Sequence, residues 1–186
     1  MRLVLASSSP RRADLLRAAG FDFVVRPADV DESVLGGEDP ATHVRRLATA
    51  KAAAIESDAD REVILGADTV VLIDQDILGK PRDDADAADM LRRLSGRDHR
   101  VLTGVALKRG TNVRVGVDQT RVWFETLTPE EIAWYVASGE PRDKAGAYAI
   151  QGLASRFVSR IEGSHTNVVG LPIHVVRRLL REMRWE

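Results

Sequence analysis

The chain has 186 residues, of which 44% are hydrophobic and 30% are charged, and its formal net charge is −1. This composition is typical of a globular protein with enough apolar residues for a core, so we expect residues 1–186 to form a single domain. The near-zero charge argues against a general affinity for nucleic acid or for anionic membranes. The sequence contains no cysteine, which excludes disulfides, zinc–thiolate sites and cysteine nucleophiles.

The first residues lead directly into a short apolar stretch, residues 3–6, with no basic leader before it. This stretch is too short for a signal peptide. No window of the sequence approaches the length of about 18 apolar residues that a membrane-spanning helix needs. We therefore expect a cytoplasmic protein without membrane contact.

Residues 2–6 predict a first strand, and a helix should follow, because Ser9 is a favourable N-cap and Pro10 suits the first helical position. The turn between them carries three serines, free backbone amides and the guanidinium groups of Arg11 and Arg12, which suits a phosphate. Two arginines in a first turn oppose the helix dipole, so a bound anion would explain them. The alternative is an ordinary Ser-Pro cap with solvated arginines.

A short strand at residues 21–25 and an acidic loop at 29–32 precede a helix that we expect to run from Asp39 to about Ser57. Lys51 lies near the apolar stripe of this helix. A lysine in that position either extends its ammonium group to solvent or reaches into a cleft.

Residues 63–73 are rich in β-branched side chains and predict a strand that is buried on both faces. Asp68 is the only charged residue in this run, and burying a carboxylate costs several kcal/mol unless a cation, a metal or hydrogen bonds compensate it. Gly66 and Ala67 leave space beside it, which suits a ligand close to the backbone. The alternatives are that Asp68 ends the strand at a turn or pairs with a structural arginine.

The rest of the chain predicts alternating helices and strands in one compact α/β unit. A tight turn at 74–76 leads to Lys80 in a Gly-Lys-Pro turn, and Thr128 opens a capping box. The other expected elements are a helix from Asp83 to Gly96, a β-hairpin of strands 100–108 and 113–124, a helix from Pro129 to Gly139, a strand at 157–161 and a final helix after Pro172.

The sequence contains no HExxH, Walker A or GxGxxG pattern, and its four histidines form no recognisable triad order. The sequence instead offers a buried carboxylate, an acidic cluster and several cations. Such a set fits metal-assisted attack on a polyphosphate, in which carboxylates hold Mg²⁺ or Mn²⁺ and cations neutralise phosphate oxygens. The residues concerned are Asp68, Asp31, Glu32, Arg11, Arg12, Lys51 and Lys80.

Eight segments spread over the whole chain resemble those of the Maf family of nucleoside triphosphate pyrophosphatases, first named as septum-formation inhibitors. They occur in the order and spacing of that family: 6–12 (ASSSPRR), 66–69 (GADT), 78–81 (LGKP), 94–96 (LSG), 103–104 (TG), 143–148 (DKAGAY), 150–152 (IQG) and 167–172 (NVVGLP). The resemblance implies an α/β fold in which helices flank a curved mixed sheet, with a cleft between two lobes, similar to inosine triphosphate pyrophosphatases. It also implies a homodimer.

The resemblance further implies roles for single residues. Asp68 matches the catalytic acid that activates water and helps to hold the metal, and Glu32 matches an acidic position near that metal. The phosphate-binding positions of the family are matched by Ser7, Ser9, Arg11, Arg12, Lys51 and Lys80.

Arg11, Thr69 and Gln151 match positions that separate the branches of the family by substrate, and here they resemble the branch that acts on dTTP and UTP. An amide such as Gln151 can donate and accept hydrogen bonds at once, which suits the edge of thymine or uracil. We therefore expect hydrolysis of these nucleotides to the monophosphate and pyrophosphate. The alternatives are modified pyrimidine, 7-methyl-GTP or other non-standard substrates in a house-cleaning role, or a nucleotide-sensing regulator of cell division.

Overall fold

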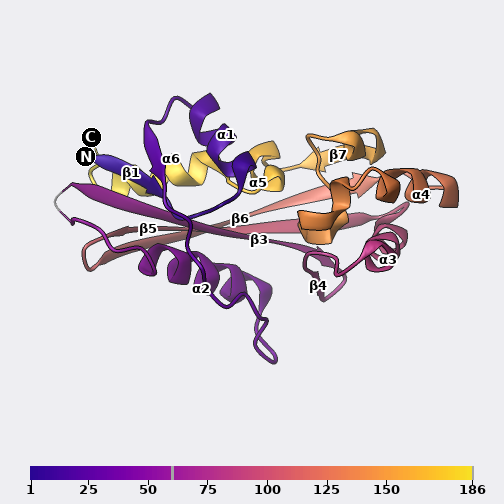
Figure 1. The fold of residues 1–186 in the computed structure, drawn as a ribbon, viewed down its shortest axis with the longest axis horizontal. Coiled ribbons are helices and arrows are strands. Elements are labelled where there is room, and N and C mark those ends of the chain that lie inside the picture. The colour runs from indigo at the N-terminus through magenta and orange to yellow at the C-terminus, as the bar shows by residue number, and fades with distance from the viewer. Residues whose placement is uncertain (60, 186) are drawn as a thin grey trace. The chain divides into compact units, whose positions relative to one another are not determined.

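A computed structural model describes residues 1–59 and 61–185 of the chain (Figure 1). The contacts within it divide the chain into two compact units. Unit 1 comprises Met1–Thr69, Thr103–Asp118 and Gly170–Glu186, and unit 2 comprises Val70–Leu102 and Gln119–Val169. That residues 1–186 act as a single domain stays a prediction. Within the described ranges, every helix is too short or too polar to cross a membrane.

The strands of the described residues form one seven-stranded sheet. They are β1 (Arg2–Leu5), β2 (Phe23–Val25), β3 (Glu62–Ile73), β4 (Asp76–Leu78), β5 (Asp98–Arg109), β6 (Asn112–Phe124) and β7 (Val158–Glu162). Their order is β2-β1-β3-β5-β6-β7, and β4 pairs with β3. Strand β1 runs parallel to both β2 and β3, whereas the β3–β4 and β6–β7 pairs are antiparallel, so the predicted mixed sheet is confirmed.

Six α-helices and three short 3₁₀-helices lie in the described ranges. The α-helices are α1 (Pro10–Ala18), α2 (Pro40–Ala53), α3 (Asp84–Leu94), α4 (Pro129–Ala137), α5 (His165–Val169) and α6 (Ile173–Glu182). The 3₁₀-helices are η1 (Glu140–Asp143), η2 (Ala145–Ala147) and η3 (Leu153–Phe157). Helices α1, α2 and α6 belong to unit 1, and the other helices belong to unit 2.

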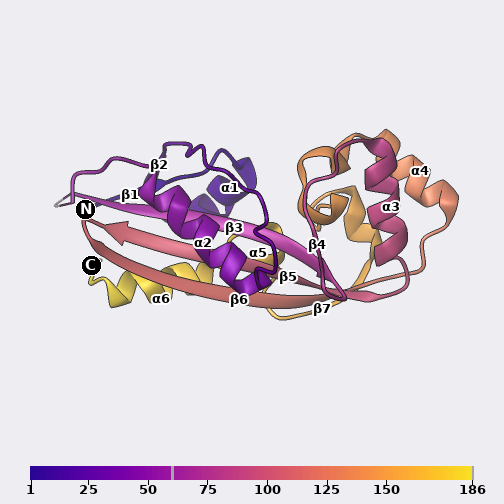
Figure 2. The same cartoon turned by 90° about the horizontal axis from the view of Figure 1, so that it is seen from below.

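In unit 1, α2 covers one face of the sheet, and α1 and α6 cover the other (Figures 1 and 2). Two glycines allow α2 to lie directly on the strands. A Cβ on Gly66 of β3 would lie 2.7 Å from the backbone nitrogen of Ala52, and one on Gly104 of β5 would lie 3.0 Å from that of Arg45. Real Cβ atoms do not approach backbone this closely, so only glycine permits this packing.

The interior of unit 1 consists of small and aliphatic side chains from the strands and from α2, among them Val4, Ala48, Ala52, Ile64 and Ala106. Burying each larger aliphatic side chain contributes about 1.5–3 kcal/mol to folding. Strand β3 is buried along nearly its whole length, as its run of β-branched residues predicts. This buried strand holds Asp68 in place.

Unit 2 has its own core, in which aromatic rings pack edge to face. His99, Phe124 and Tyr148 lie with ring centroids 4.8–5.3 Å apart, and the Nε2 of His99 is 2.8 Å from the hydroxyl of Tyr148. The predicted capping box of α4 is present, since the side chains of Thr128 and Glu131 bond reciprocally to each other's backbone amides. The helix therefore begins where the sequence predicts.

The structure also departs from the expected elements. Helix α2 ends at Ala53 and not near Ser57. Helix α5 was not predicted, because five residues are too few to show a helical period. Ser9 occupies the N-cap position of α1, but its side chain forms no capping bond; its own N–H donates to Oγ of Ser7 at 3.2 Å.

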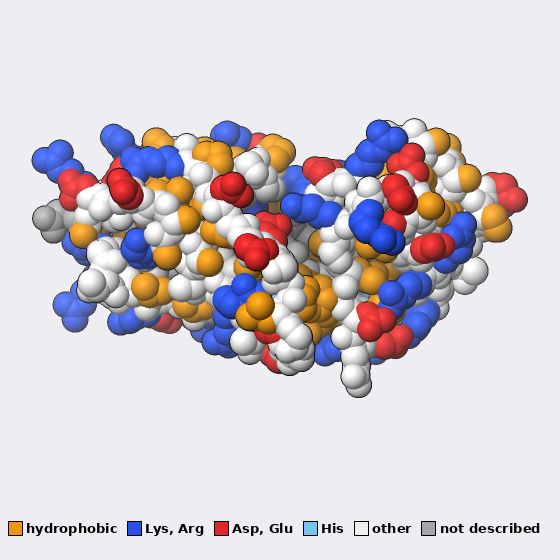
Figure 3. Space-filling view, turned by 60° about the horizontal axis from the view of Figure 1, so that its bottom comes forward, with side chains coloured by type: hydrophobic (Ala, Val, Ile, Leu, Met, Phe, Trp, Pro, Cys, Tyr) orange, Lys and Arg blue, Asp and Glu red, His pale blue; other side chains and the backbone are white. Residues whose placement is uncertain are grey.

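Charged side chains of both signs are mixed over the molecular face in Figure 3, where Lys and Arg lie among Asp and Glu. Several ion pairs of the described residues join neighbours on one helix or at its start, such as Arg17 with Asp14 and Arg82 with Asp86. Exposed pairs of this kind contribute little to stability. Arg177, Arg178 and Arg181 of α6 are also exposed.

Candidate active site

Asp68 lies in the middle of β3 and is only 7% exposed. Its Oδ1 accepts a hydrogen bond of 2.7 Å from the ammonium nitrogen of Lys51, which is itself buried. The partner that the buried carboxylate requires is thus a lysine of α2. Asp68 therefore lies inside the strand and not at a turn that ends it, and its ion-pair partner is a lysine and not an arginine.

Lys51 contacts a second carboxylate as well. Its Nζ lies 2.6 Å from Oε1 of Glu32, whose side chain is 46% exposed. One ammonium group therefore holds two carboxylates, one buried and one at the surface. Lys51 reaches into the site and does not extend to solvent, which decides between the two positions that the sequence allowed.

The space beside Gly66, two residues before Asp68, is occupied by helix α2 and not by a ligand site. The interpretation that Gly66 clears room for a ligand was wrong, because the backbone of α2 at Ala48 and Ala52 fills that space. The missing Cβ brings the helix close to β3. Lys51, one residue before Ala52, thereby comes within hydrogen-bonding distance of Asp68.

Arg12 connects three further parts of unit 1. Its Nε donates to the carbonyl of Gly170 at 2.9 Å, its Nη1 to Oγ of Ser7 at 3.1 Å and its Nη2 to Oγ1 of Thr69 at 3.2 Å. Thr69 also lies 3.0 Å from Oγ1 of Thr103. The guanidinium is thus fixed in one orientation next to the strand that carries Asp68.

Arg12 interacts electrostatically with the carboxylates of Asp68 and Glu32. Burial lowers the pKa of Arg12, while the charges of Asp68 and Glu32 raise it and the charge of Arg11 lowers it. An arginine in a protein keeps its charge even so. The result is a cluster of cations and carboxylates around Arg12 and Lys51.

A second ion pair anchors the loop that carries Glu32. Arg46 of α2 binds both carboxylate oxygens of Glu38 and donates from Nη2 to the carbonyl of Ser33 at 3.0 Å. The bonds from Arg46 lower the pKa of Glu38 to about 2, and a bond from His43 adds to the effect. The sequence analysis missed Glu38 and Arg46; their spacing of eight residues across a helix start is no recognised signal.

Unit 1 contains eight of the ten predicted site residues, and it brings seven of them into contact or electrostatic range of one another. These seven are Ser7, Arg11, Arg12, Glu32, Lys51, Asp68 and Thr69. Ser9 is linked to them only through its backbone N–H, which donates to Ser7.

The remaining two predicted residues, Lys80 and Gln151, belong to unit 2. Both are exposed. The turn that carries Lys80 is held by a bond of 3.0 Å from the N–H of Gly146 to the carbonyl of Gly79. A Cβ on Gly146 would meet the side chain of Val71, and its φ of +68° favours glycine. Segments 78–81 and 143–148, which the sequence analysis singled out separately, are therefore neighbours.

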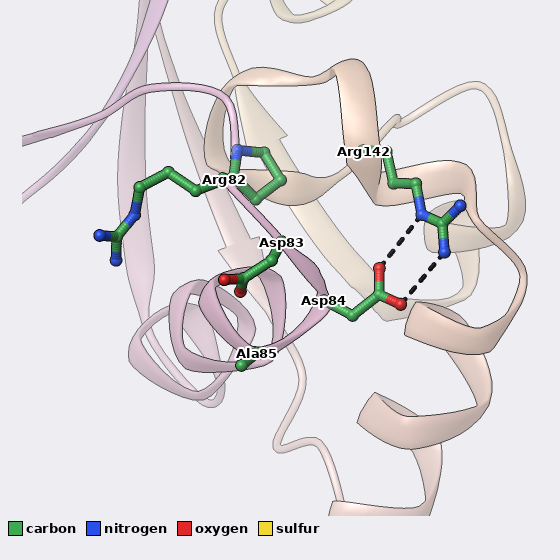
Figure 4. A pocket seen from close by; sticks show the side chains of 6 residues that line it. Arg82, Asp83, Asp84, Ala85 and Arg142 are labelled. Carbon is green, nitrogen blue, oxygen red and sulfur yellow. Dashed lines mark hydrogen bonds and ion pairs between the residues drawn. The ribbon is translucent and has the colours of Figure 1, made fainter.

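A surface hollow at the start of α3 contains none of the predicted site residues (Figure 4). It is lined by Pro81, Arg82, Asp83, Asp84, Ala85 and Arg142. Arg142 binds the carboxylate of Asp84 through two bonds of 3.1 Å, and Arg82 pairs with Asp86. Because its cations already pair with carboxylates, we assign this hollow no catalytic role.

The donor set around Lys51 fits a divalent cation such as Mg²⁺. Mg²⁺ binds carboxylate oxygens and takes most of its other ligands from water and substrate phosphates. Asp68 and Glu32 supply two such carboxylates next to one ammonium group. The described residues contain no cluster of three or more acidic or histidine side chains that could hold a metal ion.

The fold places the chain in a known structural class. It aligns with the Ham1 protein of Staphylococcus aureus at a TM-score of 0.55 and 13% identity, over 98% of this chain and 100% of that one. The likeness supports the predicted α/β fold, a mixed sheet flanked by helices. At this identity it concerns the fold alone.

The sequence comparisons define the family. The profile described as Maf-like protein matches residues 2–183, and this chain belongs to the Maf family, as the eight segments predicted. It is 51% identical over 181 residues to a protein of Symbiobacterium thermophilum named dTTP/UTP pyrophosphatase, covering 97% of this chain and 93% of that protein. A protein of Geobacter sp. strain M21 with the same name is 52% identical, covering 96% and 94%.

Proposed function

We propose that this protein hydrolyses dTTP and UTP to the nucleoside monophosphate and pyrophosphate. The observation that carries the proposal is the position of the Lys51 ammonium between the carboxylates of Asp68 and Glu32, with Arg12 in the same cluster. The names of relatives about half identical over nearly the full chain support the same activity. The site combines cations, which can bind a polyanion, with carboxylate oxygens, which can bind its metal ion.

In this reaction, water attacks the α-phosphorus and the bond from that phosphorus to the bridging oxygen breaks. The water oxygen then belongs to the monophosphate, and pyrophosphate leaves. Asp68 accepts the proton of the attacking water, since Lys51 and the surrounding core hold its carboxylate in one orientation. Positioning and charge stabilisation account for most of catalysis in phosphoryl transfer.

The phosphate oxygens are bound by the cations and hydroxyls of unit 1, and the family resemblance gives Lys80 the same role. Arg12 is already oriented by Ser7, Thr69 and the carbonyl of Gly170, so less conformational entropy is lost when phosphate binds. The other proposed phosphate-binding residues are Ser7, Ser9, Arg11 and Lys51. Each stabilises negative charge that increases as pyrophosphate leaves.

A divalent cation, Mg²⁺ or Mn²⁺, would be held by Asp68 and Glu32, and when bound it supplies positive charge against the phosphate oxygens. Lys51 keeps the two carboxylates close to each other, so the ligands are positioned in advance. We propose that Thr69, Arg11 and Gln151 select the base.

We further propose that the protein acts in the cytoplasm as a homodimer and that it binds neither nucleic acid nor membrane. The resemblance of the eight segments and the near-neutral charge support this. Sedimentation of the purified chain at micromolar concentration tests the dimer, and a single species of monomer mass would contradict it.

The experiment that tests the function is a screen of triphosphates with Mg²⁺, in which pyrophosphate is assayed. We expect dTTP and UTP to be hydrolysed fastest in a panel that includes CTP, GTP, ITP and 7-methyl-GTP. Release of orthophosphate would contradict the proposal. In water enriched with oxygen-18, the label should enter the monophosphate and not pyrophosphate. A protein that binds nucleotide but hydrolyses none would favour the sensor alternative.

A further inference from the structure

The segment from Ala149 to Ala154, which carries Gln151, is held from inside unit 2 by two side chains. Tyr135 of α4 donates its hydroxyl to Oε1 of Glu140 at 2.8 Å, and its oxygen accepts the N–H of Ala149 at 3.2 Å. The carboxylate of Glu140 accepts the N–H groups of Leu153 at 3.0 Å and of Ala154 at 3.4 Å. Both ends of the segment are therefore bound to one phenol–carboxylate pair.

The middle of the segment lies directly on the same carboxylate. A Cβ on Gly152 would lie 2.5 Å from Cδ of Glu140, so a side chain there would displace the Glu140 carboxylate from the segment. Tyr135 is fully buried, whereas Gln151 is exposed. The backbone is thus fixed on its inner side while the Gln151 side chain remains accessible to a ligand.

The chemistry of the pair explains why it holds the backbone firmly. Carboxylate oxygens form stronger hydrogen bonds to backbone N–H groups than neutral acceptors do. Burial, together with the bond to Glu140, raises the pKa of Tyr135, so its hydroxyl stays protonated and donates. Neither side chain lies among the residues proposed to touch the triphosphate.

We propose that Glu140 and Tyr135 are positioning residues for base selection: they fix the backbone of residues 149–154 and so hold the Gln151 amide against the pyrimidine edge. The proposal rests on the proposed function, in which Gln151 reads the base. An amide on a mobile segment can turn to pair with uracil or with cytosine, because it carries both a donor and an acceptor. A fixed backbone favours one of the two arrangements.

The variants Tyr135→Phe and Glu140→Gln test this proposal. The first removes the hydroxyl, and the second places an amide donor against backbone donors. We expect the ratio of kcat/KM for UTP to that for CTP to fall about tenfold in each, mainly through a higher KM for UTP. Inhibition by pyrophosphate, which has no base, should be unchanged. Gly152→Ala should act in the same direction, because its Cβ displaces the segment from Glu140.

Glu131→Gln is the matched control. It makes the same chemical change, Glu to Gln, at the third position of α4. The capping box at the start of that helix can be formed by either Glu or Gln at this position. Its UTP to CTP ratio should equal that of the unaltered protein. Amide hydrogen exchange adds a readout that does not depend on activity: the amides of Ala149, Leu153 and Ala154 should exchange faster in Tyr135→Phe and Glu140→Gln.

Two results would overturn the proposal: an unchanged UTP to CTP ratio in both variants, or an equal loss of kcat for every triphosphate. The second would mean that the pair supports only the stability of unit 2. If the unaltered protein hydrolyses no nucleotide, the proposed function fails, while faster exchange confined to residues 149–154 still shows that the pair holds the segment.

Discussion

The ammonium nitrogen of Lys51 lies 2.7 Å from Oδ1 of Asp68, and the two residues are separated by seventeen positions in the sequence. Helix α2 supplies the cation and strand β3 supplies the carboxylate. Both side chains are buried, so each charge depends on the other for its stabilisation. This pair anchors the candidate site, and the first two predictions concern it.

Replacing Lys51 with methionine should lower the free energy of unfolding by about 3–5 kcal/mol, because the Asp68 carboxylate would remain buried without its cation. The double variant Lys51→Met/Asp68→Leu should recover most of this loss, since it buries no charge at that position. Urea denaturation of the single and double variants measures the difference. Equal stability of the two would show that the carboxylate does not need Lys51.

Asp68→Asn should lower kcat by about two orders of magnitude or more, because the amide cannot accept the proton of the attacking water. Nucleotide binding should persist, since Arg12 keeps its three hydrogen bonds to Ser7, Thr69 and Gly170. Single-turnover kinetics with UTP, together with calorimetric binding, separate the two effects. A fully active Asp68→Asn protein would refute the catalytic assignment.

Gly66→Ala should destabilise the protein by about 1–3 kcal/mol, because the new Cβ meets the backbone of α2 and forces it away from β3. The displacement should also lower activity, because Lys51 lies on the displaced helix. Gly36→Ala is the control: a Cβ there has open space within 4 Å and should change stability little. Thermal unfolding of both variants gives the comparison, and equal midpoints would contradict the prediction.

His99 should make stability depend on pH between about 6.5 and 4. Burial lowers the pKa of His99 from 6.5 to about 4. In that window the unfolded chain binds a proton that the folded chain excludes, so stability is complete above pH 6.5 and falls as the pH falls toward 4. The loss from this residue is about 3 kcal/mol.

The variant His99→Gln should lack this part of the pH dependence and still offer Tyr148 a hydrogen-bond partner. Guanidinium denaturation at pH 7, 6, 5 and 4 compares it with the unaltered protein. An identical slope in both proteins would mean that another group causes the pH dependence.

Local patterns predicted most elements and several site residues. Asp68 stood out because a charge interrupts an apolar strand, and Lys51 because a cation falls near an apolar stripe. Capping residues located the starts of α2, α3 and α4, since a cap is a contact between residues three positions apart. The five residues of α5 were too few for such a signal.

Local sequence patterns could not identify the contact partners of these residues. Gly66 was interpreted as space for a ligand, but the backbone of helix α2 packs against it. A glycine in a sequence indicates that some group packs closely there, but it does not identify that group. The role of Glu140 likewise depends on backbone donors 13 and 14 positions away. No spacing rule links such residues.

By itself, the sequence determined most of the elements, the buried position of Asp68, the cations available to a polyphosphate and the membership of the Maf family. Only the tertiary structure decided that Lys51 neutralises both Asp68 and Glu32, that Arg12 is fixed by Ser7, Thr69 and Gly170, and that Glu140 holds the segment of Gln151. The physical reason is range: turns, caps and apolar periodicity depend on residues within a few positions, whereas a buried charge is stabilised by whichever partner the folded chain brings within hydrogen-bonding distance.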